Sequence, residues 1–409
     1  MTLLLPLLLV LAACGRGAEP VSFATRTDSA GVEVVVNATP LWSAGEGWRI
    51  DAVPTLQIGH RADRDSLYDL LRVSAGAVLR SGEIVALVSA NRQARVFAAS
   101  GEWLRSIGRD GAGPGELRRV SAMSLSGDTI FIPDGELRRL NAFRLTGEFL
   151  KSWPYFAAEG IGNLPPSHRL DDGSWIASAG LPFGPADFSA EGMLRQRIRY
   201  YRVDAELSAL LDTIAEAQGR ELAVTRTDGT DDLRGMVETA LPAPLGRFSA
   251  VAVAADRFAL GDNSAPEVRF HAADGRLRRI VRWNAPATPV DGALLERLKL
   301  EALARTEGNE AAQRSIESQY SRVSPGPVVP YFEDLRIDAA GALWVQEYLL
   351  SAADSVHFRI FRSDGQFLGR RTLPPRHRML DIGRDRMLTV WQDDDDLEYL
   401  RVYRVVRTP

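Results

Sequence analysis

The sequence repeats a short unit in which an aromatic residue, a glycine and then further apolar residues follow one another at nearly fixed spacing. The copies are Phe97–Leu104, Phe143–Leu150 and Phe361–Leu368, a version at Phe270–Leu277 with one more residue before the glycine, and a degenerate version at Tyr201–Leu207 with Ala205 in the glycine position. Glycines at matched positions indicate a hairpin turn in which one residue takes a positive φ. Because apolar and polar residues alternate around the turn, each copy predicts a strand, a turn and a strand.

A second predicted hairpin precedes several copies, for example at Ala122–Ile132 and Leu335–Val345. Two hairpins supply four strands in a repeat of about 40 residues, which is the pattern of a β-propeller blade. A helical solenoid would instead show a 3.6-residue periodicity throughout. The sequence therefore predicts an all-β chain, a six-bladed β-propeller, with blades at about 70–107, 118–153, 165–214, 246–283, 331–373 and 377–406.

The sixth predicted blade has only three recognisable strands. Near the N-terminus, Trp48–Ile58 is followed by Gly59, and it ends like the outer strand Leu104–Ile107, which is followed by Gly108. We infer that this N-terminal strand completes the C-terminal blade. Such closure pairs otherwise open sheet edges and holds the ring shut.

The segment between the first two predicted blades, from Ile107 to Leu117, reads Ile-Gly-Arg-Asp-Gly-Ala-Gly-Pro-Gly-Glu-Leu. It resembles the inter-blade linker of NHL-repeat propellers, where a glycine-rich turn leads from an outer strand to the next inner strand. With the repeated hairpins, it makes residues 48–406 similar to the NHL-like six-bladed propellers, which are often bacterial lipoproteins. A phosphate-binding loop is disfavoured, because the segment lacks a Lys-Ser/Thr ending and precedes a strand.

Two segments interrupt the β pattern. Between Asp291 and Val323, leucines recur at helical spacing, with Asp291 as the expected N-cap and Gly308-Asn309 dividing two short helices. This insertion between the fourth and fifth blades is either a structural cap or a lid over the central channel. The polar stretch Ala215–Ala243 predicts a long loop, which is a candidate for binding.

The N-terminal residues predict export. Residues 1–13 are predicted to form a signal peptide, because the short apolar run Leu3–Ala13 ends in small residues before Cys14. The run resembles the lipobox of bacterial lipoproteins, which implies lipidation of Cys14, a tether over 14–30 and a propeller over 31–409. An ordinary cleavage site is the alternative. Cys14 is the only cysteine, so the propeller holds no intramolecular disulfide.

The composition excludes some partners. The chain has 409 residues, 45% of them hydrophobic, and a net charge of −4 with scattered basic residues. These values are typical of a globular protein and indicate neither a nucleic-acid footprint nor a polybasic membrane surface. We expect no nucleic-acid partner and no cofactor.

No linear catalytic or metal motif is present: the histidines have unrelated spacings, and no Gly-x-Ser-x-Gly elbow occurs. Aligning the predicted innermost strands places Ser74 and several charged residues near the channel mouth. The predicted ligand-binding residues are Arg119, His168, Arg247, Glu333, Arg336 and His377. A ring dominated by arginine suits an anionic ligand better than a divalent cation. Solvated or locally paired side chains are the alternative.

Acidic residues recur at the ends of the predicted second strands, at Asp134, Asp262, Glu347 and Asp393. In NHL-type repeats the matching acid supports the following turn, and we expect that role here. The run Asp393–Asp396 predicts a solvated hairpin tip, with a calcium site as the alternative.

Together these features predict a propeller displayed in the cell envelope, in the periplasm or at the outer membrane, and anchored by lipid. We expect it to bind a protein, peptide or glycan without catalysis. The alternative is a channel-centred, metal-dependent hydrolase or lyase of the lactonase type.

Overall fold

A computed structural model describes residues 23–43, 45–60, 66–182, 187, 193–223, 241–322 and 326–407. The described residues form six sheets that each contain four hydrogen-bonded strands in a meander, numbered here one to six in chain order. The first three are β5 (Val73–Val78), β6 (Ile84–Val88), β7 (Gln93–Phe97) and β8 (Trp103–Ile107); β11 (Ser124–Ser126), β12 (Thr129–Asp134), β13 (Arg139–Arg144) and β14 (Phe149–Pro154); and β17 (Pro166–Arg169), β18 (Trp175–Gly180), β19 (Met193–Val203) and β20 (Leu210–Ala223), with β21 (Leu241–Pro242) beside β20.

The other three sheets take in the N-terminal segment. They are β22 (Ser249–Ala254), β23 (Arg257–Asp262), β24 (Glu267–Ala272) and β25 (Leu277–Trp283) with β1 (Ala24–Ser29) and β2 (Val32–Asn37); β26 (Phe332–Ile337), β27 (Leu343–Glu347), β28 (Val356–Phe361) and β29 (Phe367–Leu373); and β30 (His377–Ile382), β31 (Arg386–Gln392) and β32 (Glu398–Val406) with β3 (Arg49–Ile50) and β4 (Leu56–Gly59). Short elements connect them: η1 (Ser66–Tyr68), η2 (Ser89–Asn91), β9 (Arg109–Asp110) with β10 (Glu116–Leu117), and β15 (Phe156–Ala158) with β16 (Gly162–Leu164).

Six apolar clusters hold the sheets together, and each cluster is shared by two sheets that follow one another. One of them joins Leu388 and Val402 of the sixth sheet to Val73 and Phe97 of the first. Since the last sheet packs on the first, the sheets form a closed ring. The predicted all-β class and β-propeller fold are therefore confirmed.

The repeat glycines adopt the predicted backbone conformation. Gly101, Gly147, Gly275 and Gly365 have φ between 84° and 101° in the hairpins between the third and fourth strands of their sheets. The third sheet differs, because Leu207 (φ 53°) and not Ala205 takes this place, and its N–H bonds to Asp204 O at 3.1 Å. The predicted alignment of this copy was wrong by two residues: burial of Leu207 in the cluster with Tyr201 stabilises a conformation normally given to glycine.

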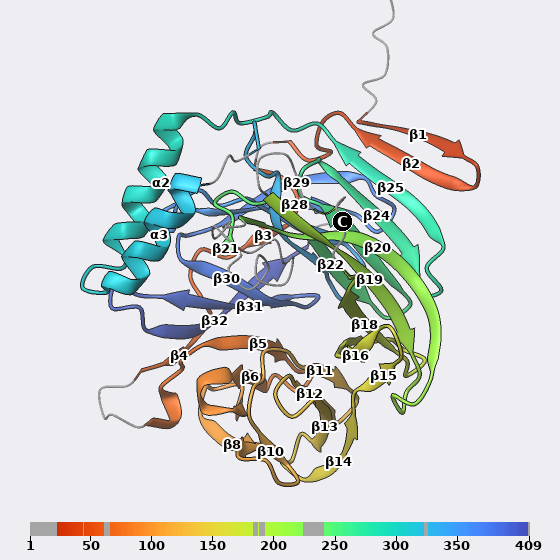
Figure 1. The fold of residues 1–409 in the computed structure, drawn as a ribbon, viewed down its shortest axis with the longest axis vertical. Coiled ribbons are helices and arrows are strands. Elements are labelled where there is room, and N and C mark those ends of the chain that lie inside the picture. Colours follow the sequence, from red (N-terminus) through yellow and green to blue (C-terminus); the bar gives the residue numbers. More distant parts are fainter. Residues whose placement is uncertain are drawn as a thin grey trace, which may run out of the picture.

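The N-terminal segment, residues 23–59, runs along the outer edges of three consecutive sheets. Its strand β2 pairs in parallel with β25, the N–H groups of Leu41 and Trp42 bond to β29, and β3 and β4 both pair with β32. The predicted completion of the last blade is thus present as two short strands. The predicted tether over 14–30 was wrong for 24–29, which form β1 (Figure 1). Cys14 and residues 1–13 lie outside the described residues.

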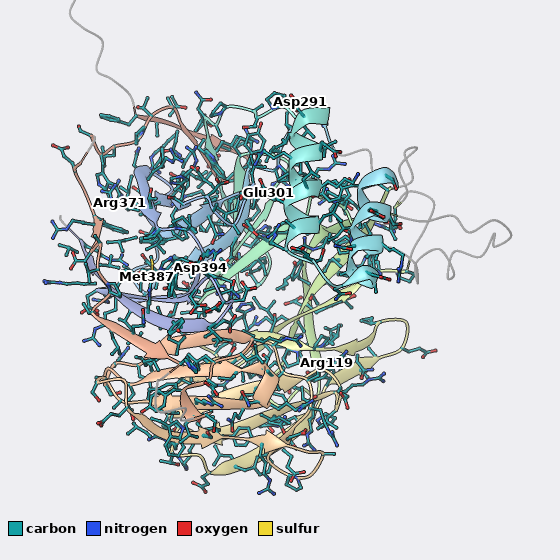
Figure 2. All side chains as sticks on the ribbon, turned by 90° about the vertical axis from the view of Figure 1, so that its left-hand side faces the viewer. Arg119, Asp291, Glu301, Arg371, Met387 and Asp394 are labelled. Carbon is teal, nitrogen blue, oxygen red and sulfur yellow. The ribbon has the colours of Figure 1, made fainter. Side chains whose placement is uncertain are left out.

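The two interruptions have different outcomes. Helices α2 (Gly292–Ala304) and α3 (Glu310–Arg322) lie side by side at one flank of the molecule (Figure 1). Asp291 precedes α2 and accepts the Leu294 N–H at 2.8 Å, as an N-cap does (Figure 2). The predicted loop over 215–243 was wrong for 215–223, because β20 continues to Ala223 along β19; residues 224–240 lie outside the described residues.

Candidate functional site

A cavity of about 390 Å³ lies where the innermost strands of all six sheets meet. We call it the central cavity. Its lining residues are Ser74, Ala75, Gly76 and Ala77 from β5, Met123, Ser124 and Leu125 from β11 or just before it, His168 and Arg169 from β17, Val253 from β22, Arg336 from β26, and Leu380 and Asp381 from β30.

β-Bulges shape this lining. The pairing of the innermost strand with its neighbour shifts by one residue at Ser74 in β5, at Ser167 in β17, at Glu333 in β26 and at Leu380 in β30. A bulge adds one unpaired residue and re-aims the side chains that follow it. In these four strands the bulge therefore decides which residues face the channel.

Arg336 is the central cation of the site. Its Nε donates to Asp334 Oδ2 at 2.9 Å, while its two Nη groups make no hydrogen bond or ion pair within the described part of the chain. Arg336 also influences the pKa values of His168 and Asp381, which line the same cavity. The arginine therefore has donors available for an anion in the cavity.

His168 is held in one orientation by a short relay. The Ser167 hydroxyl donates to Ile176 O at 2.9 Å, so its oxygen accepts the proton of His168 Nδ1 at 3.1 Å. Burial, with the nearby Arg336 charge, lowers the pKa of His168 to about 4. The ring is therefore neutral at pH 7, and its Nε2, which carries no proton, has no hydrogen-bond partner in the described ranges, while the residue itself lines the cavity.

Asp381 and Ser74 complete the polar lining. Asp381 Oδ2 accepts the Val78 N–H at 3.1 Å, which links the sixth sheet to the first, and burial raises the pKa of this carboxyl. The Ser74 and Ser89 hydroxyl oxygens are 2.6 Å apart. The Asp381 side chain was not predicted from the sequence: its strand slips by one residue at Leu380, and no local sequence signal marks that slip.

Of the predicted ligand-binding residues, the structure brings His168 and Arg336 together in the central cavity. Arg119 is outside it: the residue is exposed and its Nη2 donates to Gly135 O at 2.9 Å. Arg247 is also outside it and pairs with the buried Glu221. Although burial alone would raise it, hydrogen bonds from Arg247 hold the pKa of Glu221 below its usual value.

Glu333 and His377 likewise do not line the central cavity. Glu333 Oε2 accepts from Gln346 Nε2 at 3.2 Å, and desolvation raises the pKa of its carboxyl. His377 is 4% exposed, with Nδ1 3.0 Å from the Pro374 and Pro375 oxygens and Nε2 2.8 Å from the Tyr403 hydroxyl. All its polar atoms are engaged, so the placement of His377 at the channel mouth was wrong.

The recurrent acids act mainly on turns. Asp134 is buried and accepts backbone N–H groups of Arg118, Glu136 and Leu137. Asp262 accepts the Ser264 N–H, and Asp393 accepts those of Asp395 and Leu397 at an exposed hairpin tip. Glu347 departs from the pattern, because it forms ion pairs with Arg359 and Arg370 instead.

Within the described residues, no group of three or more His, Cys, Asp and Glu side chains is arranged to hold a metal ion. In the same part of the chain, no helix has the length and apolar character needed to cross a membrane.

Comparisons identify the fold but no family. No protein-family model matches the sequence, and no curated protein does. A structure from Bacteroides fragilis described as an exported protein shares 11% identity with a TM-score of 0.50, covering 92% of this chain and 100% of its own. A DUF4221 family member from Bacteroides vulgatus shares 10% identity with a TM-score of 0.51, covering 88% and 99%. At such identities the similarity shows the β-propeller fold alone.

Proposed function

We propose that this chain is a binding protein that holds an anionic group of a protein, peptide or glycan ligand in the central cavity. The observation that carries the proposal is Arg336, whose Nη groups have no partner among the described residues and lie at a cavity lined by all six sheets. A guanidinium with free donors binds a carboxylate through charge-assisted hydrogen bonds, which are about twice as strong as neutral ones.

The lining favours binding over the hydrolase or lyase alternative. A general base works best when its pKa is near the operating pH, and His168, with a pKa of about 4, is a weak base at pH 7. Besides Arg336 and the Asp334 carboxyl bonded to it, the charged or titratable groups at the cavity are Arg169, the His168 imidazole and the Asp381 carboxyl, whose pKa is raised. A lining with two arginines suits an anion better than a divalent cation.

The proposal is tested by calorimetric titration with D-glucuronate and cyclohexanecarboxylate. We expect Arg336→Gln to weaken carboxylate binding roughly ten- to a hundredfold, the equivalent of about 1.5–3 kcal/mol for a hydrogen bond to a charged group. Arg119→Gln is the matched control, because it removes an exposed arginine outside the cavity. Equal affinity of both variants for the carboxylates, or no carboxylate binding at all, would contradict the proposal.

We further propose display in the cell envelope through lipid on Cys14, supported by the apolar run that precedes this cysteine. The glycine-rich linker, in which Gly108, Gly111 and Gly115 all have positive φ, supports kinship with the NHL-like propellers. The wild-type protein should sediment with membranes and enter the detergent phase of a phase-separation assay, whereas Cys14→Ala should stay in the aqueous phase. Aqueous partition of both proteins would refute the anchor.

A further inference from the structure

Resting on the proposed function, we infer that the group bound in the central cavity is a hydroxy-carboxylate, such as the uronic acid of a glycan, and not a simple carboxylate. The inference comes from matching hydrogen-bond donors to acceptors in the cavity lining. Arg336 offers donors, whereas His168 Nε2 offers an acceptor. A ligand that satisfies both carries an anionic group and a hydrogen-bond donor, which the hydroxyl groups of a uronic acid supply.

The acceptor character of His168 Nε2 follows from its neighbours. Ile176 O can only accept, so the Ser167 hydroxyl must donate to it, and the Ser167 oxygen is then left to accept from His168 Nδ1. With the proton fixed on Nδ1, Nε2 presents a lone pair. A carboxylate oxygen placed against this lone pair would be repelled, whereas a hydroxyl would donate to it.

Asp381, which lies where the sixth sheet meets the first, adds a second acceptor to the cavity lining. One of its oxygens accepts the Val78 N–H, and a carboxyl group has further lone pairs for a hydroxyl group. Because the central cavity is lined by strands from every sheet, these acceptors and Arg336 face one common space. Its volume of about 390 Å³ falls within the range of about 300–1,000 Å³ for small-molecule sites.

We expect these acceptors to make the central cavity discriminate strongly between carboxylates that carry a hydroxyl group and carboxylates that do not. A site built to hydrogen-bond a hydroxyl rejects an analogue that lacks it, because the buried acceptor is then left unpaired. Three probes of similar ring size separate the contributions: D-glucuronate carries both groups, cyclohexanecarboxylate only the anion, and D-glucose only the hydroxyls.

The experiment is calorimetric titration of the full chain with the three probes. We expect D-glucuronate to bind at least tenfold more tightly than either of the others. His168→Leu should reduce the preference for D-glucuronate over cyclohexanecarboxylate by about tenfold or more, because it removes one of the two hydroxyl acceptors. Equal binding of the two carboxylates by the wild type, or a preference as large in His168→Leu as in the wild type, would overturn the inference while leaving the proposed function standing. Binding of D-glucose as tight as D-glucuronate would instead overturn the proposed function.

A second measurement uses the wild-type protein and therefore does not require that a variant folds. Nitrogen chemical shifts of ¹⁵N-histidine-labelled protein at pH 7 should show the free His168 ring protonated at Nδ1 and bare at Nε2. Addition of D-glucuronate should move the Nε2 resonance toward that of a hydrogen-bonded acceptor, and cyclohexanecarboxylate should not. A proton on Nε2 in the free protein would overturn the inference.

Discussion

His168 links the stability of the fold to pH. In the unfolded chain a histidine takes up its proton below a pKa near 6.5, whereas the buried His168 does so only near pH 4. Between these values the unfolded state binds one more proton than the folded state, so the free energy of unfolding falls as the pH is lowered. We expect a loss of about 2–3 kcal/mol from this residue between pH 7 and pH 4.

Urea unfolding of the wild type and of His168→Gln at pH 7 and pH 4 measures this loss. The acidic groups, and His271 and His377, whose pKa values burial also lowers, are present in both proteins. The difference between the two pH responses therefore isolates His168. Identical pH responses would show that His168 does not titrate as described.

Asn37 fastens the N-terminal segment to two sheets. It is 1% exposed; its Nδ2 donates to Arg282 O and Gly365 O, and its Oδ1 accepts the Phe367 N–H at 2.7 Å. Asn37→Ala leaves two carbonyls and one N–H unpaired, so we expect a loss of about 2–4 kcal/mol in urea unfolding. Asn91→Ala, at an exposed position, is the matched control and should change stability by less than about 0.5 kcal/mol.

At the scale of the elements, helix α2 is held against the propeller by the leucines on only one of its faces. Leu298 is 7% exposed and packs with Leu245 and Val329, whereas Leu300 on the same helix is 57% exposed. Hydrogen exchange of α2 and α3 should accelerate markedly in Leu298→Ala and stay near wild type in Leu300→Ala, because only the first change leaves a cavity. Similar exchange in the two variants would mean that α2 is not held by this contact.

The elements also show how far the sequence predicts the fold. Hairpins were predictable because each is encoded locally, by a glycine with positive φ between alternating strands, as at Gly101 and Gly365. The residues that line the cavity were harder to predict, because a one-residue bulge exchanges the two faces of a strand. The bulges at Glu333 and Leu380 have no recognisable local sequence signal. Of the predicted ligand-binding residues, only His168 and Arg336 therefore line the central cavity.

At the scale of the whole molecule, ring closure depends on short strands far from the rest of their sheet in sequence. Strands β3 and β4 pair with β32 across more than 300 residues. Without them the edge of β32, including Val402 and Leu400, would lose its partners, and Ile58 would leave the cluster that joins the sixth sheet to the first. An unpaired edge with buried apolar side chains invites aggregation.

Two truncations therefore distinguish the strands that close the ring, β3 and β4, from the strands β1 and β2, which only extend the fourth sheet. Removal of residues 23–47 takes away β1 and β2 but keeps β3 and β4, so we expect a folded monomer with a lower urea midpoint. Removal of residues 23–59 also takes away β3 and β4, and we expect loss of the cooperative unfolding transition together with aggregation in size-exclusion chromatography. Because the six clusters form one closed ring, opening it between the sixth and first sheets should destabilise every sheet and not the sixth alone. A folded, monomeric 23–59 deletion with a cooperative transition would show that the ring closes without its N-terminal strands.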